Sequence, residues 1–191
     1  MLSDDHLCTL PVNSVERNVA LQALGAGDYR STIFARPHTF IDRMEDGLLQ
    51  REDGQDASPT DVCLFQSGGG GSGSVRVSYQ WAVPVKGEVA GRSPLEGKRY
   101  TVNTLPAEAG GIESKFSFSC VMPGKNRALS KQVQLIAWAT FTGEPRGGVR
   151  KSRDVQHLEL TYLMARKAVD VLGCENAPLQ GDPVVVSAAA P

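Results

Sequence analysis

Four cysteines are the residues whose type and spacing point most directly to a chemistry. Cys8, Cys63, Cys120 and Cys174 are far apart, with no Cys-x-x-Cys pair and no nearby His-x-x-x-His. Zinc sites require such close spacing, so we predict no metal site. An even number of scattered cysteines fits two long-range disulfide bonds, which persist in an oxidising compartment. We therefore expect an extracellular or cell-surface protein; the alternative is four buried, reduced thiols in the cytoplasm.

Two pairings of these cysteines are sensible. Cys8–Cys63 with Cys120–Cys174 would join each helix to a neighbouring hairpin, whereas Cys8–Cys174 with Cys63–Cys120 would tie the chain ends and the two hairpins together. The sequence alone does not decide the connectivity. We favour the first pairing, because Cys174 follows a helix whose apolar stripe must lie on the sheet, where Cys120 points inward.

A glycine-rich run raises the question of phosphate binding. It reads Gln-Ser-Gly-Gly-Gly-Gly-Ser-Gly-Ser-Val at residues 66–75. A phosphate loop needs a helix directly after its glycines, because the helix N-terminus helps to hold the anion. Here the following residues alternate between apolar and polar up to Val83, which predicts a strand. We interpret 67–74 as a hairpin loop, either native or an engineered flexible linker, and expect no cofactor.

Histidine is the side chain most often used as a general base, and the chain has three: His6, His38 and His157. No Gly-x-Ser-x-Gly elbow accompanies them, and the cysteines are better used in disulfides. His157, near Asp154 and Glu159, falls one residue before a helical apolar stripe, so we interpret it as an exposed or capping residue. We predict no catalytic residue. A small hydrolase remains an alternative, since any two carboxylates can meet in space.

Charge is distributed unevenly along the chain, although the net value is only −1 with a pI near 6.3. Acidic residues crowd an early segment: Asp42, Glu45, Asp46, Glu52, Asp53 and Asp56. Basic residues gather in the last third, and we name as a candidate partner-binding segment Arg146, Arg150, Lys151 and Arg153. The aromatic residues lie in apolar strands and do not alternate with these bases, so we expect no nucleic-acid partner.

The elements that must position these residues follow from hydrophobic periodicity. Helices are predicted from about Asn13 to Leu24 and, most clearly, from Ser152 or Asp154 to Gly173. Phe40 to Gln50 is interpreted as either a short helix or irregular structure, and the acidic stretch from Asp42 to Asp56 as a solvated loop. Alternating or apolar runs predict strands at residues 29–34, 62–65, 75–83, 100–105, 116–122 and 133–141. The pattern predicts one disulfide-bonded α+β domain at 1–176, with two main helices on one face of an antiparallel sheet, and a mobile tail at 177–191.

Short motifs around the cysteines resemble those of secreted or lipid-anchored actinobacterial proteins of unknown function. They are Cys8-Thr-Leu-Pro before a helix, Phe118-Ser119-Cys120 in a strand, and Gly173-Cys174 after a long helix. The resemblance spans residues 8–175 and implies an envelope location and a disulfide-bonded α+β domain. It supplies no catalytic residues.

No apolar run reaches the roughly 20 residues that cross a bilayer, and residues 1–8 do not resemble a signal peptide, so we expect any export signal or anchor to lie outside this sequence. The function that we expect is an extracytoplasmic, envelope-associated recognition or assembly module without catalytic activity. Its expected partner is another envelope protein or an anionic wall polymer. The alternatives are a small extracytoplasmic hydrolase and a ligand-binding sensor domain.

Overall fold

One antiparallel sheet of eight strands dominates the computed structural model, which describes residues 7–69, 71–91, 97–143 and 153–188. The strand order is β1-β2-β3-β7-β6-β5-β4-β8. The strands are β1 (Tyr29–Ile33), β2 (Thr60–Ser67), β3 (Ser74–Ala82), β4 (Lys98–Val102), β5 (Leu105–Gly110), β6 (Glu113–Phe118), β7 (Gln134–Thr142) and β8 (Val185–Ser187).

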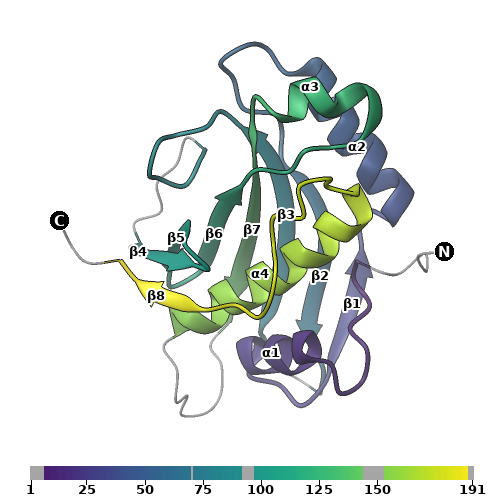
Figure 1. Ribbon diagram of the computed structural model, residues 1–191. Helices are drawn as coiled ribbons and strands as arrows, with labels where there is room; N and C mark the ends of the chain where they lie inside the picture. Colours follow the sequence, from purple (N-terminus) through teal and green to yellow (C-terminus); the bar gives the residue numbers. More distant parts are fainter. Residues whose placement is uncertain (1–6, 70, 92–96, 144–152, 189–191) are drawn as a thin grey trace.

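Helices lie on one face of this sheet. Figure 1 shows α4 (Arg153–Leu172) crossing it diagonally, with α1 (Val15–Leu24) and α2 (Pro37–Gln50) beside it. A 3-10 turn, η1 (Gly124–Asn126), leads into the single-turn helix α3 (Arg127–Ser130). The predicted α+β fold, with α1 and α4 as main helices on an antiparallel sheet, is confirmed. None of the described helices is long and apolar enough to cross a membrane.

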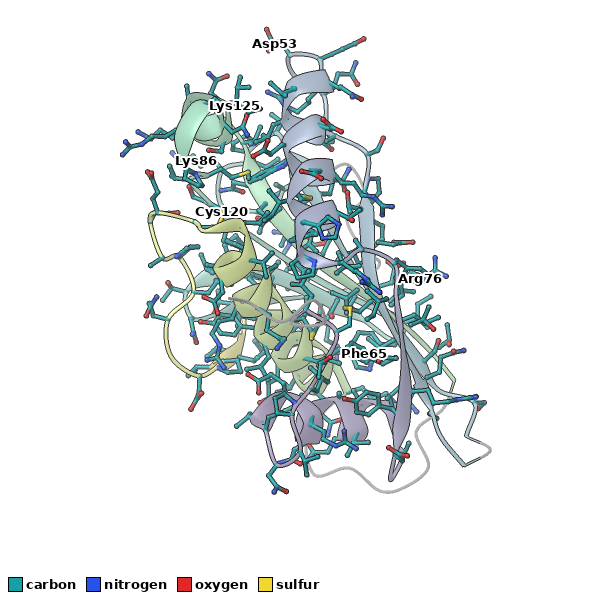
Figure 2. The ribbon with its side chains drawn as sticks, turned by 90° about the vertical axis from the view of Figure 1, so that its right-hand side faces the viewer. Asp53, Phe65, Arg76, Lys86, Cys120 and Lys125 are labelled. Atoms are coloured by element: carbon teal, nitrogen blue, oxygen red, sulfur yellow. A yellow bond between two sulfur atoms is a disulfide. The ribbon has the colours of Figure 1, made fainter. Side chains whose placement is uncertain are left out.

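The period-two pattern of β3 determines which side chains enter the core. Its odd-numbered residues from Val75 to Trp81 are buried, and its even-numbered residues face the opposite side of the sheet. Figure 2 shows Arg76 of β3 pointing away from α4, whereas Phe65 of the neighbouring strand β2 lies on the helix side. On this second face, Ala90 of the segment after β3 donates its backbone N–H to the hydroxyl of Ser117 at 3.0 Å and covers part of the sheet.

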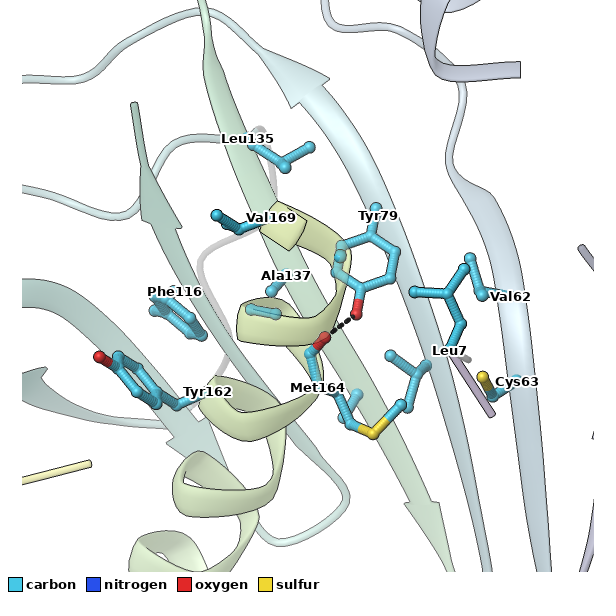
Figure 3. Packing of buried hydrophobic residues seen from close by; sticks show 14 of the residues in the cluster. Leu7, Val62, Cys63, Tyr79, Phe116, Leu135, Ala137, Tyr162, Met164 and Val169 are labelled. Atoms are coloured by element: carbon cyan, nitrogen blue, oxygen red, sulfur yellow. Dashed lines mark hydrogen bonds between the residues drawn. The ribbon is translucent and has the colours of Figure 1, made fainter. Parts of the chain in front are cut away.

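Two buried polar side chains of β3 connect the sheet to the helices. The Tyr79 hydroxyl donates to the Met164 carbonyl of α4 at 2.8 Å, inside the apolar cluster drawn in Figure 3. The indole Nε1 of Trp81 donates to the Met44 carbonyl of α2 at 2.9 Å. Both groups are therefore buried without losing their hydrogen bonds, as a close-packed core requires.

Two disulfide bonds join Cys8 to Cys63 and Cys120 to Cys174. This is the favoured pairing, and it is confirmed. Each bond joins a residue adjoining a terminal helix to the sheet region, because Cys8 precedes α1 and Cys174 follows α4. All four residues are buried, which shields the sulfur atoms from exchange with dissolved thiols.

Of the two interpretations of residues 40–50, the helix is correct, because α2 runs from Pro37 to Gln50; the solvated-loop interpretation of 42–56 is wrong for its first part. Pro37 occupies the first turn of this helix, where its missing N–H costs nothing. Phe40, Met44 and Leu48 recur every four residues and are buried against the sheet. The acidic residues between them concealed this short apolar stripe.

The segment after Asn176, predicted to be a mobile tail, packs against the domain as far as residue 188. Leu179 is buried, and β8 pairs antiparallel with β4. The side chain of Asn103, in the turn after β4, accepts a hydrogen bond from the backbone N–H of Val184 at 2.7 Å. Residues 177–188 therefore extend the sheet by one edge strand that local pattern did not reveal.

The glycine-rich run joins β2 to β3, as predicted, and its glycines approach other backbone closely. The Ser67 hydroxyl lies 3.0 Å from the Gly73 carbonyl and 3.3 Å from the Leu24 carbonyl at the end of α1. A Cβ atom added at Gly73 would lie 2.8 Å from the Leu24 oxygen and 2.9 Å from the Ser67 hydroxyl. The hairpin loop is thus fitted against α1.

Substituting Gly73→Ala should therefore lower the free energy of unfolding by about 1–3 kcal/mol, the usual effect of overpacking. The matched control is Gly27→Ala, because a Cβ there meets no atom within 4 Å. Urea unfolding followed by circular dichroism measures both variants. Equal stabilities for the two variants would contradict the close approach of this loop to α1.

Candidate ligand-binding pocket beside helix α2

The basic segment proposed for partner binding falls largely outside the described residues. Arg146, Arg150 and Lys151 all lie there, and Arg153 is the exposed first residue of α4. The structure therefore does not bring these four side chains together in its described part. Their role in partner binding stays a prediction.

His157 is buried, so its interpretation as an exposed or capping residue is wrong. Its ring stacks on Phe141 with the centroids 3.5 Å apart, and its Nδ1 atom is buried without a hydrogen-bond partner. Burial lowers the pKa of His157 to about 4, although the nearby Asp154 carboxylate opposes this shift. The cause of the burial is tertiary, since α4 packs on the sheet and Phe141 of β7 covers the ring of His157.

The other candidate groups do not assemble around this histidine. Asp154 accepts a hydrogen bond from the Tyr100 hydroxyl at 2.7 Å, and His38 is exposed in the first turn of α2. The described part of the chain has no group of three or more metal-ligating side chains. His157 is therefore enclosed in the core, and no described contact supports a role for it as a general base.

A polar pocket of about 510 Å³ lies between α2 and the segment that leads into β2. This volume is within the range of small-molecule sites, about 300–1,000 Å³. Unlike most such sites, it is lined mainly by charged and polar side chains. The lining residues are Arg43, Asp46, Gly47, Gln50, Arg51, Glu52, Gln55, Asp56, Ala57, Ser58, Pro59 and Thr60.

One wall of the pocket is a face of α2. Arg43, Asp46 and Gln50 follow one another at three- and four-residue steps, so they project from the same side of the helix. Gly47 lies between them and brings α2 close to the opposite wall, where its Cβ position is 3.6 Å from the Ala57 Cβ. Because Phe40, Met44 and Leu48 of α2 pack on the core, this face of the helix points toward solvent.

The opposite wall is a loop anchored by hydrogen bonds. Ala57 donates its backbone N–H to the Trp81 carbonyl at 2.8 Å, and the Asp56 carboxylate accepts from the Val83 N–H at 2.9 Å. Within the loop, one terminal nitrogen of Arg51 donates to the carbonyls of Glu52 and Gln55 at 3.1 and 3.0 Å. This wall of the pocket is therefore held in place by the C-terminal end of β3 and by Val83 just beyond it.

Several polar groups of the pocket have no protein partner. The Asp46, Gln50 and Glu52 side chains make no hydrogen bond or ion pair with any described residue, and the Nε atom of Arg51 is buried without an acceptor. Exposed acceptors and the guanidinium group of Arg51 thus line one pocket. The arrangement suits binding of a hydrophilic ligand, and no histidine is among the lining residues.

Sequence reasoning missed this pocket. The acidic residues of 42–56 were assigned to a solvated loop, and such a loop would not form the rigid side of a pocket. The signal that could have located the pocket was the four-residue spacing of Phe40, Met44 and Leu48, because a buried stripe there directs Asp46 outward.

Comparisons with protein-family models, curated proteins and solved structures found no match for this chain. Residue roles therefore have to be inferred from exposures, contacts and charges. In the described structure, the pocket beside α2 combines a concave shape with charged and polar side chains.

Proposed function

We propose that this protein is an extracytoplasmic, envelope-associated recognition module that binds a hydrophilic ligand in the pocket beside α2 and catalyses no reaction. The observation that carries the proposal is the pocket itself, with walls held in place by backbone hydrogen bonds and with unpaired polar groups between them. Such a preorganised polar concavity lowers the ordering cost of binding.

Two buried disulfides support the location. Such bonds persist in oxidising compartments and are rare where glutathione keeps thiols reduced. A partner from the envelope would meet the protein there. The basic segment that includes Arg153 is a second contact for an anionic wall polymer in this proposal.

A hydrolase is supported less well than a binding module. Asp46, Glu52 and Asp56 share the pocket, so paired carboxylates are present, but Asp56 already accepts the Val83 N–H. A sensor with a closed apolar cavity between helix and sheet is also less well supported, because the space there is filled by the side chains of Figure 3. A polar pocket at the surface is better suited to recognition.

The test is a thermal-shift and ligand-observed NMR screen of small hydrophilic compounds, both charged and neutral. Ser58→Phe should abolish binding, because Ser58 lines the pocket and a phenyl ring would occupy it. Ser119→Phe is the matched control, since this serine is also exposed but lies outside the lining. Hits that bind wild type and Ser58→Phe equally would rule out the pocket, and turnover of a hit would favour the hydrolase.

A further inference from the structure

The α2 pocket is lined by side chains of both signs of charge. Asp46 and Glu52 are carboxylates without a partner among the described residues. Arg43 and Arg51 supply guanidinium groups; one terminal nitrogen of Arg43 donates to the Phe34 carbonyl, and one of Arg51 donates to two backbone carbonyls. Guanidinium N–H groups match the geometry of a ligand carboxylate, and carboxylates match an ammonium group.

The bonding of Arg51 determines which of its nitrogens can meet a ligand in the pocket. The Nε–H of Arg51 is shielded from solvent, yet no protein atom accepts from it. This nitrogen is therefore closed to a ligand as well as to water, and the terminal nitrogens of Arg51 are the donors that can face one. A carboxylate oxygen is the acceptor that best complements a charged guanidinium.

We propose that the α2 pocket binds a small zwitterion, a free amino acid or a short peptide with both ends free. The ligand carboxylate contacts Arg51 and Arg43, and the ligand ammonium contacts Asp46 and Glu52. The inference deepens the proposed function and depends on it, because it names the ligand class of the same pocket. No aromatic side chain lines the pocket, which disfavours ligands that are held by their apolar faces.

The test uses trialanine as the probe, with N-acetylated and C-amidated trialanine as blocked forms, titrated into the full chain by calorimetry. We expect each blocked form to bind at least about tenfold more weakly, which corresponds to one lost charge-assisted contact. Equal binding of free and blocked forms, or no binding of trialanine, would overturn the zwitterion proposal.

A variant tests the contact proposed for the ammonium end of the ligand. Asp46→Asn should weaken trialanine about tenfold but leave the N-acetylated form unchanged, because that form has no ammonium group to lose. Asp53→Asn is the matched control, since Asp53 lies at the tip of the same loop, outside the lining (Figure 2). Equal weakening of both peptides by Asp46→Asn would contradict the assignment.

The failure of this inference is distinguishable from failure of the proposed function. Suppose that the wider screen yields neutral or singly charged compounds that bind wild type but not Ser58→Phe, while trialanine does not bind. The pocket is then a ligand site, and the zwitterion is the wrong ligand class. If Ser58→Phe weakens the binding of no compound, both proposals are wrong.

Discussion

Replacing Cys120 and Cys174 together by alanine should lower the free energy of unfolding by about 4 kcal/mol. The bond closes a loop with a sequence separation of 54 residues, and opening it restores entropy to the unfolded chain. The Cys8/Cys63 double variant should lose a similar amount, because its loop has a separation of 55. Guanidinium unfolding under non-reducing conditions measures both changes.

Reductant supplies the control for these variants. In the presence of dithiothreitol, wild type should fall to nearly the stability of a protein lacking both bonds, if the bonds and not the packing of sulfur carry the effect. Intact-mass analysis after alkylation without reductant should find no modified cysteine. Alkylation of all four residues would refute the disulfides and the argument for an oxidising compartment.

Acid should destabilise the protein through His157. The pKa of His157 is about 4 in the folded state and about 6.5 in an unfolded chain, so the unfolded state takes up the proton first. The contribution of neutral His157 is complete above pH 6.5 and is lost as the pH falls toward 4. At 1.36 kcal/mol per pH unit, the loss approaches about 3 kcal/mol.

The variant that isolates this effect is His157→Phe, which keeps a ring against Phe141 but cannot take up a proton. Its stability difference from wild type should change by about 3 kcal/mol between pH 7 and pH 4. His38→Gln retains His157 and should retain the acid-side loss. Stability curves of wild type and His157→Phe that stay parallel across this range would show that His157 is not held neutral.

Local pattern was sufficient for the elements that bury a regular apolar face. The alternation from Val75 to Trp81 predicted β3, and the stripe through Leu158, Ala165 and Leu172 predicted α4. Those periods survive in the structure because one side of each element packs on the core. The same reasoning favoured the cysteine pairing that the structure shows, since Cys120 was expected to face the terminal helix, but the sequence left the other pairing open.

The candidate site could not be predicted in the same way. The short stripe of α2 is interrupted by charged residues and Gly47, so its helical spacing is a weak signal. The acidic composition around it favoured a loop instead. A pocket also needs a second wall, and that wall exists because Ala57 and Asp56 bond to residues at the end of β3, more than 20 positions later.

The sequence by itself determined the α+β class, the two main helices, the hairpin at the glycine run and the presence of four cysteines in positions to pair. Those features depend on spacing between near neighbours and on turn chemistry. Only the tertiary structure decided that His157 is buried, that residues 185–187 form an edge strand, and that Arg51 and Asp46 line one pocket. Each of these depends on segments distant in sequence that exclude water or supply a hydrogen-bond partner, and local periodicity carries no information about them.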